Sequence, residues 1–188
     1  MGAPILGQIQ ALGHLTSADE RAFLAVCRVR PLATKDFVSR AGEVCDALTF
    51  VNSGLLRIFF HAEAQERTCR FLPENSWYTD FESFSRGTPS LENLQALEDS
   101  EVVQIRKADL DQLYRDHPNL ERVGRLLTEQ ALLEIHQRNR MLTLDTPEVR
   151  YDRLCSESPA LVNRIPQYYL ASYLNIRPES LSRIRKRR

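Results

Sequence analysis

The chain has 188 residues, of which 43% are hydrophobic and 27% are charged, and its 25 basic residues balance its 25 acidic residues. This composition is typical of a soluble globular protein that is large enough to bury a core. No run approaches the roughly 18 apolar residues that a membrane helix needs, and residues 1–10 lack the basic start and apolar core of a signal peptide. We therefore expect a cytoplasmic protein without a membrane partner.

Neither the cysteines nor the histidines have the spacing of a metal site. The four cysteines are scattered without a C-x-x-C pair, and the four histidines are equally dispersed. This spacing argues against an iron–sulfur cluster or a zinc site built from neighbouring residues. We expect free thiols, no metal and no cofactor.

The first predicted element is an amphipathic helix over residues 12–30, which Thr16 or Ser17 caps and Pro31 ends. Residues 37–106 then change to short β-rich runs that alternate polar and apolar residues between frequent turns. This pattern predicts an antiparallel barrel or sandwich, and we expect a jelly-roll barrel in an α+β protein. We also predict a short helix over residues 80–86, between two of the strands, and another over residues 109–116, which closes the barrel after its last strand.

A long helix is predicted from Pro118 to about Leu144 and ends before the break at residues 145–147. Its apolar stripe is close to a heptad repeat and consists of Leu120, Val123, Leu127, Ala131, Ile135 and Leu142. Such a seam can pair with a second copy or pack against its own barrel. We favour a homodimer, because a small barrel alone cannot cover a seam of this length.

The C-terminal residues 165–188 have the spacing of a helix-turn-helix. Their apolar positions would join two helices across a turn, and they are Leu170, Ala171, Leu174, Ile176, Leu181 and Ile184. Asn175 falls at the turn and tolerates positive φ, and Pro178 suits the first turn of the second helix. Two helices with a short turn are typical of a DNA-binding motif.

The second of these helices has a basic polar face, formed by Arg177, Glu179, Ser180, Arg183, Lys186 and Arg187. Residues 177–188 contain six basic residues and one acidic residue, a net charge of +5, so the rest of the neutral chain carries −5. A basic end on an acidic body indicates attraction to phosphates. A basic end that only complements the helix dipole is the alternative, but the packing pattern favours double-stranded DNA as the partner.

The order of helix, barrel, long helix and helix-turn-helix resembles the Crp/Fnr family of bacterial transcription regulators. Residues 37–43, 49–57, 96–99, 150–151, 170–174 and 181–185 resemble the family locally as well. The resemblance implies an effector-sensing β-barrel domain with an N-terminal helix at residues 1–117, a long dimerisation helix at residues 118–145 and a DNA-binding domain at residues 146–188.

The same resemblance implies a homodimer that reads a near-palindromic DNA site, with RNA polymerase as a further partner. Glu179 and Arg183 match the base-reading positions, where arginine can bind guanine through two hydrogen bonds and glutamate can accept one from cytosine. Pro178 stands where many members carry arginine. Members usually continue into a small β-wing after the recognition helix. Either the sequence stops short of that wing, or this helix-turn-helix has none and contacts the DNA backbone through its arginine tail.

The cassette that binds the cyclic phosphate in this family is altered here. The helix of this cassette, at residues 78–83, lacks the family's glycine. In the following residues 88–91, Ser90 occupies the position of the phosphate-binding arginine. A buried phosphate without a cation is costly, and Asp80 and Glu82 would repel it, although Arg70 or Arg86 could substitute. We therefore expect no response to cyclic AMP. The effector, if one exists, is unknown.

The candidate pocket residues are Phe71, Trp77, Asp80, Phe81, Glu82, Ser83, Thr88, Ser90 and His136. The aromatic ones can line a cavity or fill the barrel, and filling is the commoner use.

Two other classes of function compete with a DNA-binding regulator. A ligand-binding or protein-interaction module with a vestigial helix-turn-helix would have no use for the basic cluster at residues 183–188. An enzyme finds no support, because no Ser/His/Asp grouping, phosphate loop or metal-ligand spacing is present. Asp80 and Glu82 are better explained as acidic residues at a helix start.

Overall fold

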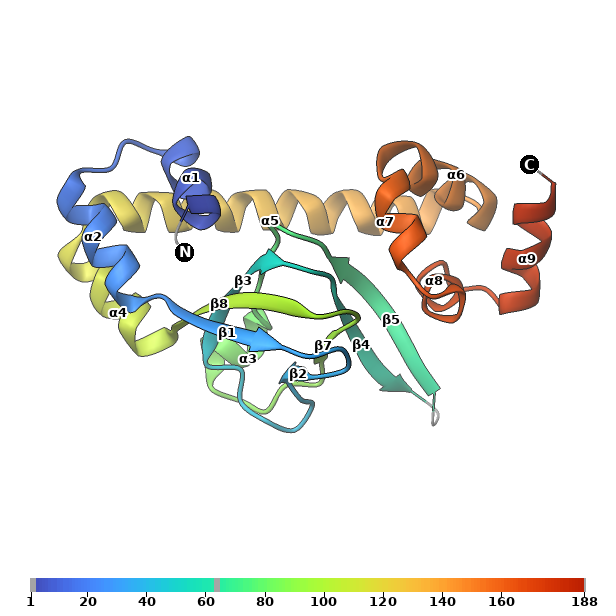
Figure 1. Ribbon diagram of the computed structural model, residues 1–188, viewed down its shortest axis with the longest axis horizontal. Coiled ribbons are helices and arrows are strands. Elements are labelled where there is room, and N and C mark those ends of the chain that lie inside the picture. The colour runs from blue at the N-terminus through green and yellow to red at the C-terminus, as the bar shows by residue number, and fades with distance from the viewer. Residues whose placement is uncertain (1–2, 63–64, 188) are drawn as a thin grey trace.

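A single long helix, α5 (Pro118–Leu144), extends along most of the longest axis of the molecule, and the other elements are arranged beside it. The structure is a computed structural model that describes residues 3–62 and 65–187. Strands lie below α5 in Figure 1, with α1, α2 and α4 at one end and α6 to α9 at the other. The predicted bounds of α5 are confirmed, and Pro118 occupies its first turn, where its missing N–H is tolerated.

The N-terminal region differs from the predicted single helix over residues 12–30. It forms α1 (Ala3–Leu12) and α2 (Ser17–Val26), and Thr16 caps α2 in a reciprocal pair of hydrogen bonds with Asp19. Pro31 does not end a helix, because it lies inside strand β1 (Arg28–Leu32). This strand is at the edge of its sheet, so the missing N–H of proline costs little there.

The remaining elements follow the order expected from the sequence, with one short strand at residues 77–78 and one short helix at residues 159–164 that the sequence did not predict. The other strands are β2 (Phe37–Ser39), β3 (Ala47–Ser53), β4 (Leu56–Ala62), β5 (Gln65–Leu72), β6 (Trp77–Tyr78), β7 (Asn93–Ala96) and β8 (Ser100–Arg106). The other helices are α3 (Phe81–Arg86), α4 (Lys107–Asp116), α6 (Pro147–Glu157), α7 (Pro159–Arg164), α8 (Gln167–Tyr173) and α9 (Pro178–Lys186). No strand follows β8 within the described residues, and no helix there is long and apolar enough to cross a membrane.

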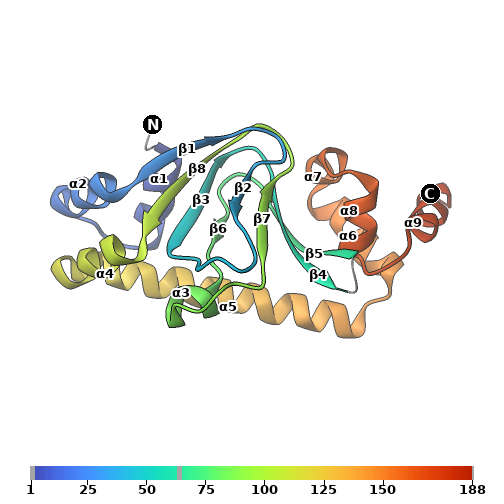
Figure 2. The ribbon, with the colours of Figure 1, turned by 90° about the horizontal axis from the view of Figure 1, so that it is seen from below.

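The strands β1 to β8, called the β-domain below, form two four-stranded antiparallel sheets. Their orders are β1-β8-β3-β6 and β2-β7-β4-β5, which is the jelly-roll arrangement expected from the sequence. Apolar side chains from both sheets, such as Val51, Val102, Leu56 and Leu94, are buried between them. Figure 2 shows the two sheets above α5, with α3 beside the middle of the long helix.

The predicted apolar seam of α5 is divided between two environments. Leu120 and Val123 are buried in the same cluster as apolar residues of α1 and α4, and Leu127 packs against that cluster. Farther along, Ile135 and Leu142 remain 50% and 39% exposed. The expectation of one continuous dimer seam from Leu120 onward is therefore corrected, because the first turns of the helix are already covered by their own chain.

Candidate functional site

The helix-turn-helix is formed by α8 and α9 at one end of the molecule. Leu170, Leu174 and Leu181 are fully buried between the two helices, as the apolar spacing predicted. Asn175 adopts the left-handed conformation with φ of 57°. The backbone N–H of Ile176 then donates to the carbonyl oxygen of Ala171 at 3.0 Å, which closes the turn.

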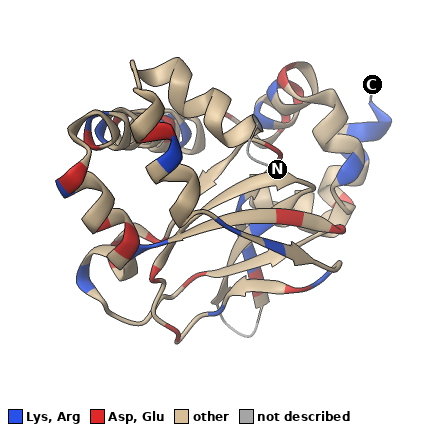
Figure 3. Cartoon of the chain, turned by 60° about the vertical axis from the view of Figure 1, so that its left-hand side comes forward, with Lys and Arg blue, Asp and Glu red and all other residues tan. Residues whose placement is uncertain are grey.

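The predicted basic face of α9 is exposed. Arg177 precedes the helix, Glu179 lies in its first turn, and Arg183 and Lys186 lie in its last turn. The guanidinium of Arg183 donates to Ser180 Oγ at 3.2 Å, and no carboxylate within the described residues pairs with the arginines or the lysine of this face. Figure 3 shows the basic residues gathered near the C-terminus. Arg187 follows the helix, and Arg188 lies outside the described residues.

Arg150 of α6 connects the long helix to the helix-turn-helix. It is buried, and its guanidinium donates to the carbonyl oxygens of Leu174 at 2.8 Å and Leu142 at 3.4 Å. These carbonyls are at the ends of α8 and α5, where the last turns of a helix have no partners within the helix. This side chain therefore links the end of α5 to the end of α8.

The C-terminal helices pack directly on the β-domain through α8 and β5. The hydroxyl of Ser172 accepts from the N–H of Thr68 at 2.9 Å and donates to the carbonyl oxygen of Glu66 at 3.2 Å. The rings of Phe71 and Tyr173 are 5.2 Å apart at their centres. Phe71 thus belongs to the same apolar cluster as Leu170, so the core continues across this junction.

A buried arginine lies at the same junction. The guanidinium of Arg57 is stacked between the rings of Phe59 and Tyr169, at 3.9 and 3.8 Å from their centres. It also pairs with Glu66 at 2.6 Å and donates to the amide oxygen of Gln95. Because Tyr169 belongs to α8, a buried cation of the β-domain is covered on one side by a ring of the C-terminal helices.

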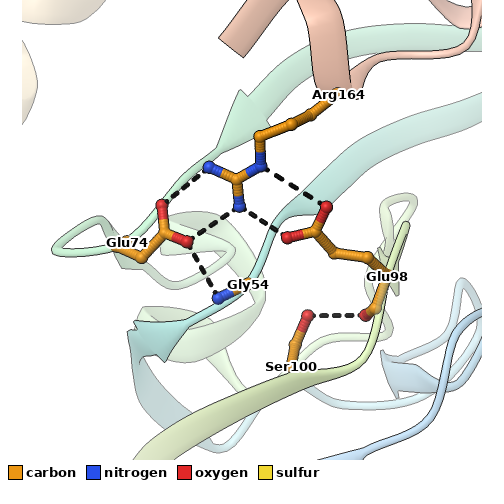
Figure 4. A network of polar contacts seen from close by, with 5 residues as sticks. All are labelled: Gly54, Glu74, Glu98, Ser100 and Arg164. Carbon is orange, nitrogen blue, oxygen red and sulfur yellow. Dashed lines mark hydrogen bonds and ion pairs between the residues drawn. The ribbon is translucent and has the colours of Figure 1, made fainter. Parts of the chain in front are cut away.

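A second arginine, Arg164, also joins the C-terminal helices to the β-domain (Figure 4). The guanidinium of Arg164, at the end of α7, donates to both oxygens of Glu74 at 2.8 and 3.0 Å. It also donates to Glu98 at 2.6 and 3.4 Å. Hydrogen bonding from Arg164 lowers the pKa of the Glu74 carboxyl, and the two carboxylates raise the pKa of Arg164. The C-terminal helices are therefore held to two turns of the β-domain.

Gly54 supports this ion-pair network from the turn between β3 and β4. Its N–H donates to Glu74 at 3.1 Å, and its φ is +92°. A Cβ on this residue would lie 2.1 Å from Ser100 Oγ, so only glycine fits.

The polar side chains of the altered cassette form hydrogen bonds with one another and with the nearby backbone. Asp80 caps α3 by accepting from the backbone N–H groups of Glu82 and Ser83, and its second oxygen accepts from Ser90 Oγ at 2.6 Å. The hydroxyl of Ser83 donates to the carbonyl oxygen of Thr88 at 2.6 Å and accepts from the N–H of Cys45. These contacts bring Asp80, Ser83, Thr88 and Ser90 together.

An additional acid, Glu92, lies beside this cassette. Its carboxylate accepts from the hydroxyl of Tyr78 at 2.9 Å, and burial raises the pKa of both groups. The nearby charge of Asp80 raises the pKa of Glu92 further. The two arginines that might have supplied a cation already have carboxylate partners, since Arg86 pairs with Glu82 and Arg70 pairs with Glu134 on α5. The charge of Arg70 partly offsets the rise in the pKa of Glu92. The cassette is thus acidic, which disfavours a phosphate.

Of the other predicted pocket residues, only Glu82 hydrogen-bonds to the cassette within the described part of the chain, through its backbone N–H to Asp80. Phe71 faces α8, and Trp77 packs against Phe50 with its indole N–H donated to Gln8 of α1. Phe81 is 66% exposed, and Glu82 and His136 are exposed as well. Sequence reasoning missed Glu92, Arg57 and Arg164, because no local pattern marks a residue whose partners come from distant segments.

Comparisons with known proteins agree with this geometry. Residues 29–117 match the family of the cyclic nucleotide-binding domain. No curated protein matches the sequence. Among solved structures, a Crp/Fnr-family regulator from Eubacterium rectale superposes with a TM-score of 0.71 at 15% identity, covering 92% of this chain and 83% of that one.

Two further structures are similar over the same length. The c-di-GMP-responsive global regulator CLP of Xanthomonas campestris has a TM-score of 0.68 at 21% identity, covering 92% of this chain and 91% of that one. The catabolite activator protein of Thermus thermophilus has a TM-score of 0.58 at 21% identity, covering 92% and 83%. Residues 29–117 therefore match the cyclic nucleotide-binding domain family, and the chain has the fold seen in these Crp/Fnr regulators.

Proposed function

We propose that this protein is a transcription regulator that binds double-stranded DNA through α9. The observation that carries the proposal is the exposed face of α9, where no carboxylate among the described residues pairs with Arg183. We assign base reading to Glu179 and Arg183 of this face. An arginine in the major groove can bind guanine through two hydrogen bonds, and the surrounding cations can bind phosphates. In this role, RNA polymerase is the expected protein partner at a promoter.

A homodimer would present two such helices to one DNA molecule. The α5 residues Leu132, Ile135 and Leu142 are 54%, 50% and 39% exposed, and they follow heptad spacing that Thr128 and Asn139 complete. Exposed apolar residues with this spacing favour a partner helix. Two copies related by a two-fold axis would place their recognition helices for half-sites about 34 Å apart, which requires a near-palindromic sequence.

The dimer is tested by light scattering of two matched variants. Ile135→Glu places a charge in the seam and should give a monomer. Leu133→Glu introduces the same charge at a residue that is 61% exposed but off the heptad spacing, and it should remain a dimer. A monomeric wild-type protein at micromolar concentration would contradict the proposed dimer.

DNA binding is tested by selecting sequences from random duplexes and measuring their affinity by fluorescence anisotropy at several salt concentrations. Arg183→Ala should weaken the selected site by about 30-fold or more, because each half-site loses a contact worth about 1–3 kcal/mol. Arg115→Ala, on exposed α4 at the other end, is the matched control and should change nothing. Circular dichroism should show both variants folded.

The alternative function, an interaction module with a vestigial helix-turn-helix, makes the opposite prediction in the same assay. With such a module, no sequence would be enriched from the random duplexes, and Arg183→Ala would not change its weak affinity for DNA. Phosphate contacts by a working interface should instead make the logarithm of the affinity fall linearly with the logarithm of salt concentration.

We further propose that the cassette does not respond to cyclic AMP. Asp80, Ser90 and Glu92 support this, because the carboxylates would repel a phosphate where the family's arginine is replaced by serine. Thermal unfolding with cyclic AMP or cyclic GMP should show no shift. A bound ligand at 100 times its dissociation constant would stabilise the protein by about 2.7 kcal/mol, and such a shift would contradict the proposal.

A further inference from the structure

An open cleft of about 800 Å³ lies between the β-domain, α5 and the C-terminal helices. Its walls come from α1, from the end of β5 and the start of β6, from one face of α5, and from α6, α7 and α8. This volume is within the range of sites for small molecules, which are commonly found where two structural units meet. Leu132, Ile135 and Leu142 do not line it, although Leu127 and Ala131 of the predicted apolar stripe do.

The cleft has a surplus of positive charge. Four arginines line it, namely Arg70, Arg138, Arg140 and Arg153, against the two glutamates Glu134 and Glu157, so the side chains that line it carry a net charge of +2. Arg70 is paired with Glu134, and Arg153 is paired with Asp145.

Two of these arginines, both on α5, have no carboxylate partner within the described residues. The guanidinium of Arg138 lies over the ring of Tyr173 at 4.4 Å from its centre, and Arg140 is exposed. Guanidinium groups in such a position can bind a phosphate or a carboxylate through two parallel hydrogen bonds. The cleft therefore offers arginine side chains to an anion, whereas the cassette presents the carboxyl groups of Asp80 and Glu92.

Aromatic rings line the same cleft. Trp77, Phe71 and Tyr173 belong to its wall, and Trp77 is held in place by the hydrogen bond from its indole nitrogen to Gln8 at 2.8 Å. The side chain of Gln8 also donates to the carbonyl oxygen of Asn75 at 2.9 Å, which fixes α1 against the turn before β6. A ring held in this way can stack against a planar ligand without first losing conformational freedom.

From these contacts we infer that the cleft, and not the cassette, binds a small ligand that combines phosphate groups with a planar aromatic ring. The phosphates lie against Arg138 and Arg140, and the ring lies against the aromatic wall. The walls of the cleft come from both the β-domain and the C-terminal helices, so the ligand bridges the two. Binding here does not depend on whether α9 binds DNA.

The test uses the only tryptophan of the sequence, Trp77, which lines the cleft. Titration with the N-methylanthraniloyl derivative of GTP should give saturable energy transfer from Trp77 to the probe, because the two lie within one site. Unlabelled GTP should displace the probe. Inorganic triphosphate should compete more weakly than GTP, since it offers the charge without the ring.

Two sets of variants locate the binding site. The double variant Arg138→Ala with Arg140→Ala should weaken probe binding by about 10-fold or more, which corresponds to about 1.4 kcal/mol. Arg125→Ala is the matched control, because Arg125 is an exposed arginine of α5 outside the cleft. Asp80→Asn controls for the cassette, and both controls should bind as the wild type does.

Three results would overturn the assignment. The first is the absence of saturable transfer up to roughly 1 mM probe, the weak limit of a specific site. The second is an equal loss of affinity in Arg125→Ala and in the double variant, which would indicate general attraction to the basic helix. The third is a change in affinity with Asp80→Asn alone, which would place the probe in the cassette. The position of the Trp77 emission maximum shows in every variant whether the cleft wall is folded.

Discussion

Replacing Arg164 by alanine removes the cation that connects α7 to two turns of the β-domain. In the wild type its guanidinium lies between the carboxylates of Glu74 and Glu98 and donates hydrogen bonds to both (Figure 4). The variant loses these hydrogen bonds and also leaves two like charges close together. We therefore expect weaker docking of the C-terminal helices on the β-domain.

The size of the loss follows from the exposure of the three side chains. Arg164 is 30% exposed and each glutamate is 38% exposed, so solvent weakens the pairs but does not abolish them. Hydrogen bonds to charged groups contribute about 1.5–3 kcal/mol when buried, and we expect a net loss of about 2 kcal/mol here. In a chain of this length that corresponds to a fall in Tm of about 4–8 °C.

The assay is thermal unfolding at one fixed protomer concentration, with Arg86→Ala as the matched control. Arg86 also pairs with a glutamate, Glu82, but the two side chains are 72% and 70% exposed. Its loss should cost less than about 0.5 kcal/mol. A double-mutant cycle of Arg164→Ala with Glu74→Gln should give a coupling of about 1 kcal/mol. Equal Tm values for the Arg164 and Arg86 variants, with no coupling to Glu74, would refute the role of Arg164 in docking.

Two further predictions concern the folding of the β-domain and its N-terminal support. Gly54→Ala should lower the free energy of unfolding by about 2–4 kcal/mol in urea, because its Cβ would meet Ser100 and its φ is positive. Gly42→Ala has a similar φ but open space around it, and should cost only about 1 kcal/mol, so equal losses would contradict the clash. Hydrogen bonds, first from Asn119, lower the pKa of buried Asp19, so its stabilisation is complete above the ordinary value of 3.8 and is lost as pH falls through the folded-state pKa. As pH falls below 3.8, the free energy of unfolding of the wild type should therefore decrease more steeply than that of Asp19→Asn. Parallel curves of unfolding free energy against pH for the two proteins would exclude the effect.

Local patterns in the sequence were sufficient to predict much of the fold. Pro118 and the break at residues 145–147 bound the long helix, and apolar spacing around Asn175 specifies the helix-turn-helix. Both predictions hold because helix periodicity and turn chemistry act over a few neighbouring residues. The absence of a cation at Ser90 could likewise be seen from the sequence, and the structure shows that position occupied by a hydrogen bond to Asp80.

Other features were decided by contacts between distant segments. Pro31 suggested the end of a helix, but pairing of residues 28–32 with β8 makes that segment an edge strand. Tyr169 covers Arg57 across a distance in sequence that no local pattern spans. Arg164 and Glu74 are likewise 90 residues apart.

The sequence by itself thus determined the long helix, the change to short strands after residue 37, the helix-turn-helix and which face of α9 is basic. Only the tertiary structure decided how the C-terminal helices sit on the β-domain and where a cleft lined by Arg138 and Arg140 opens between them. The physical reason is that backbone hydrogen bonding and side-chain periodicity are local, whereas the pairing of two surfaces depends on the shape and charge of both.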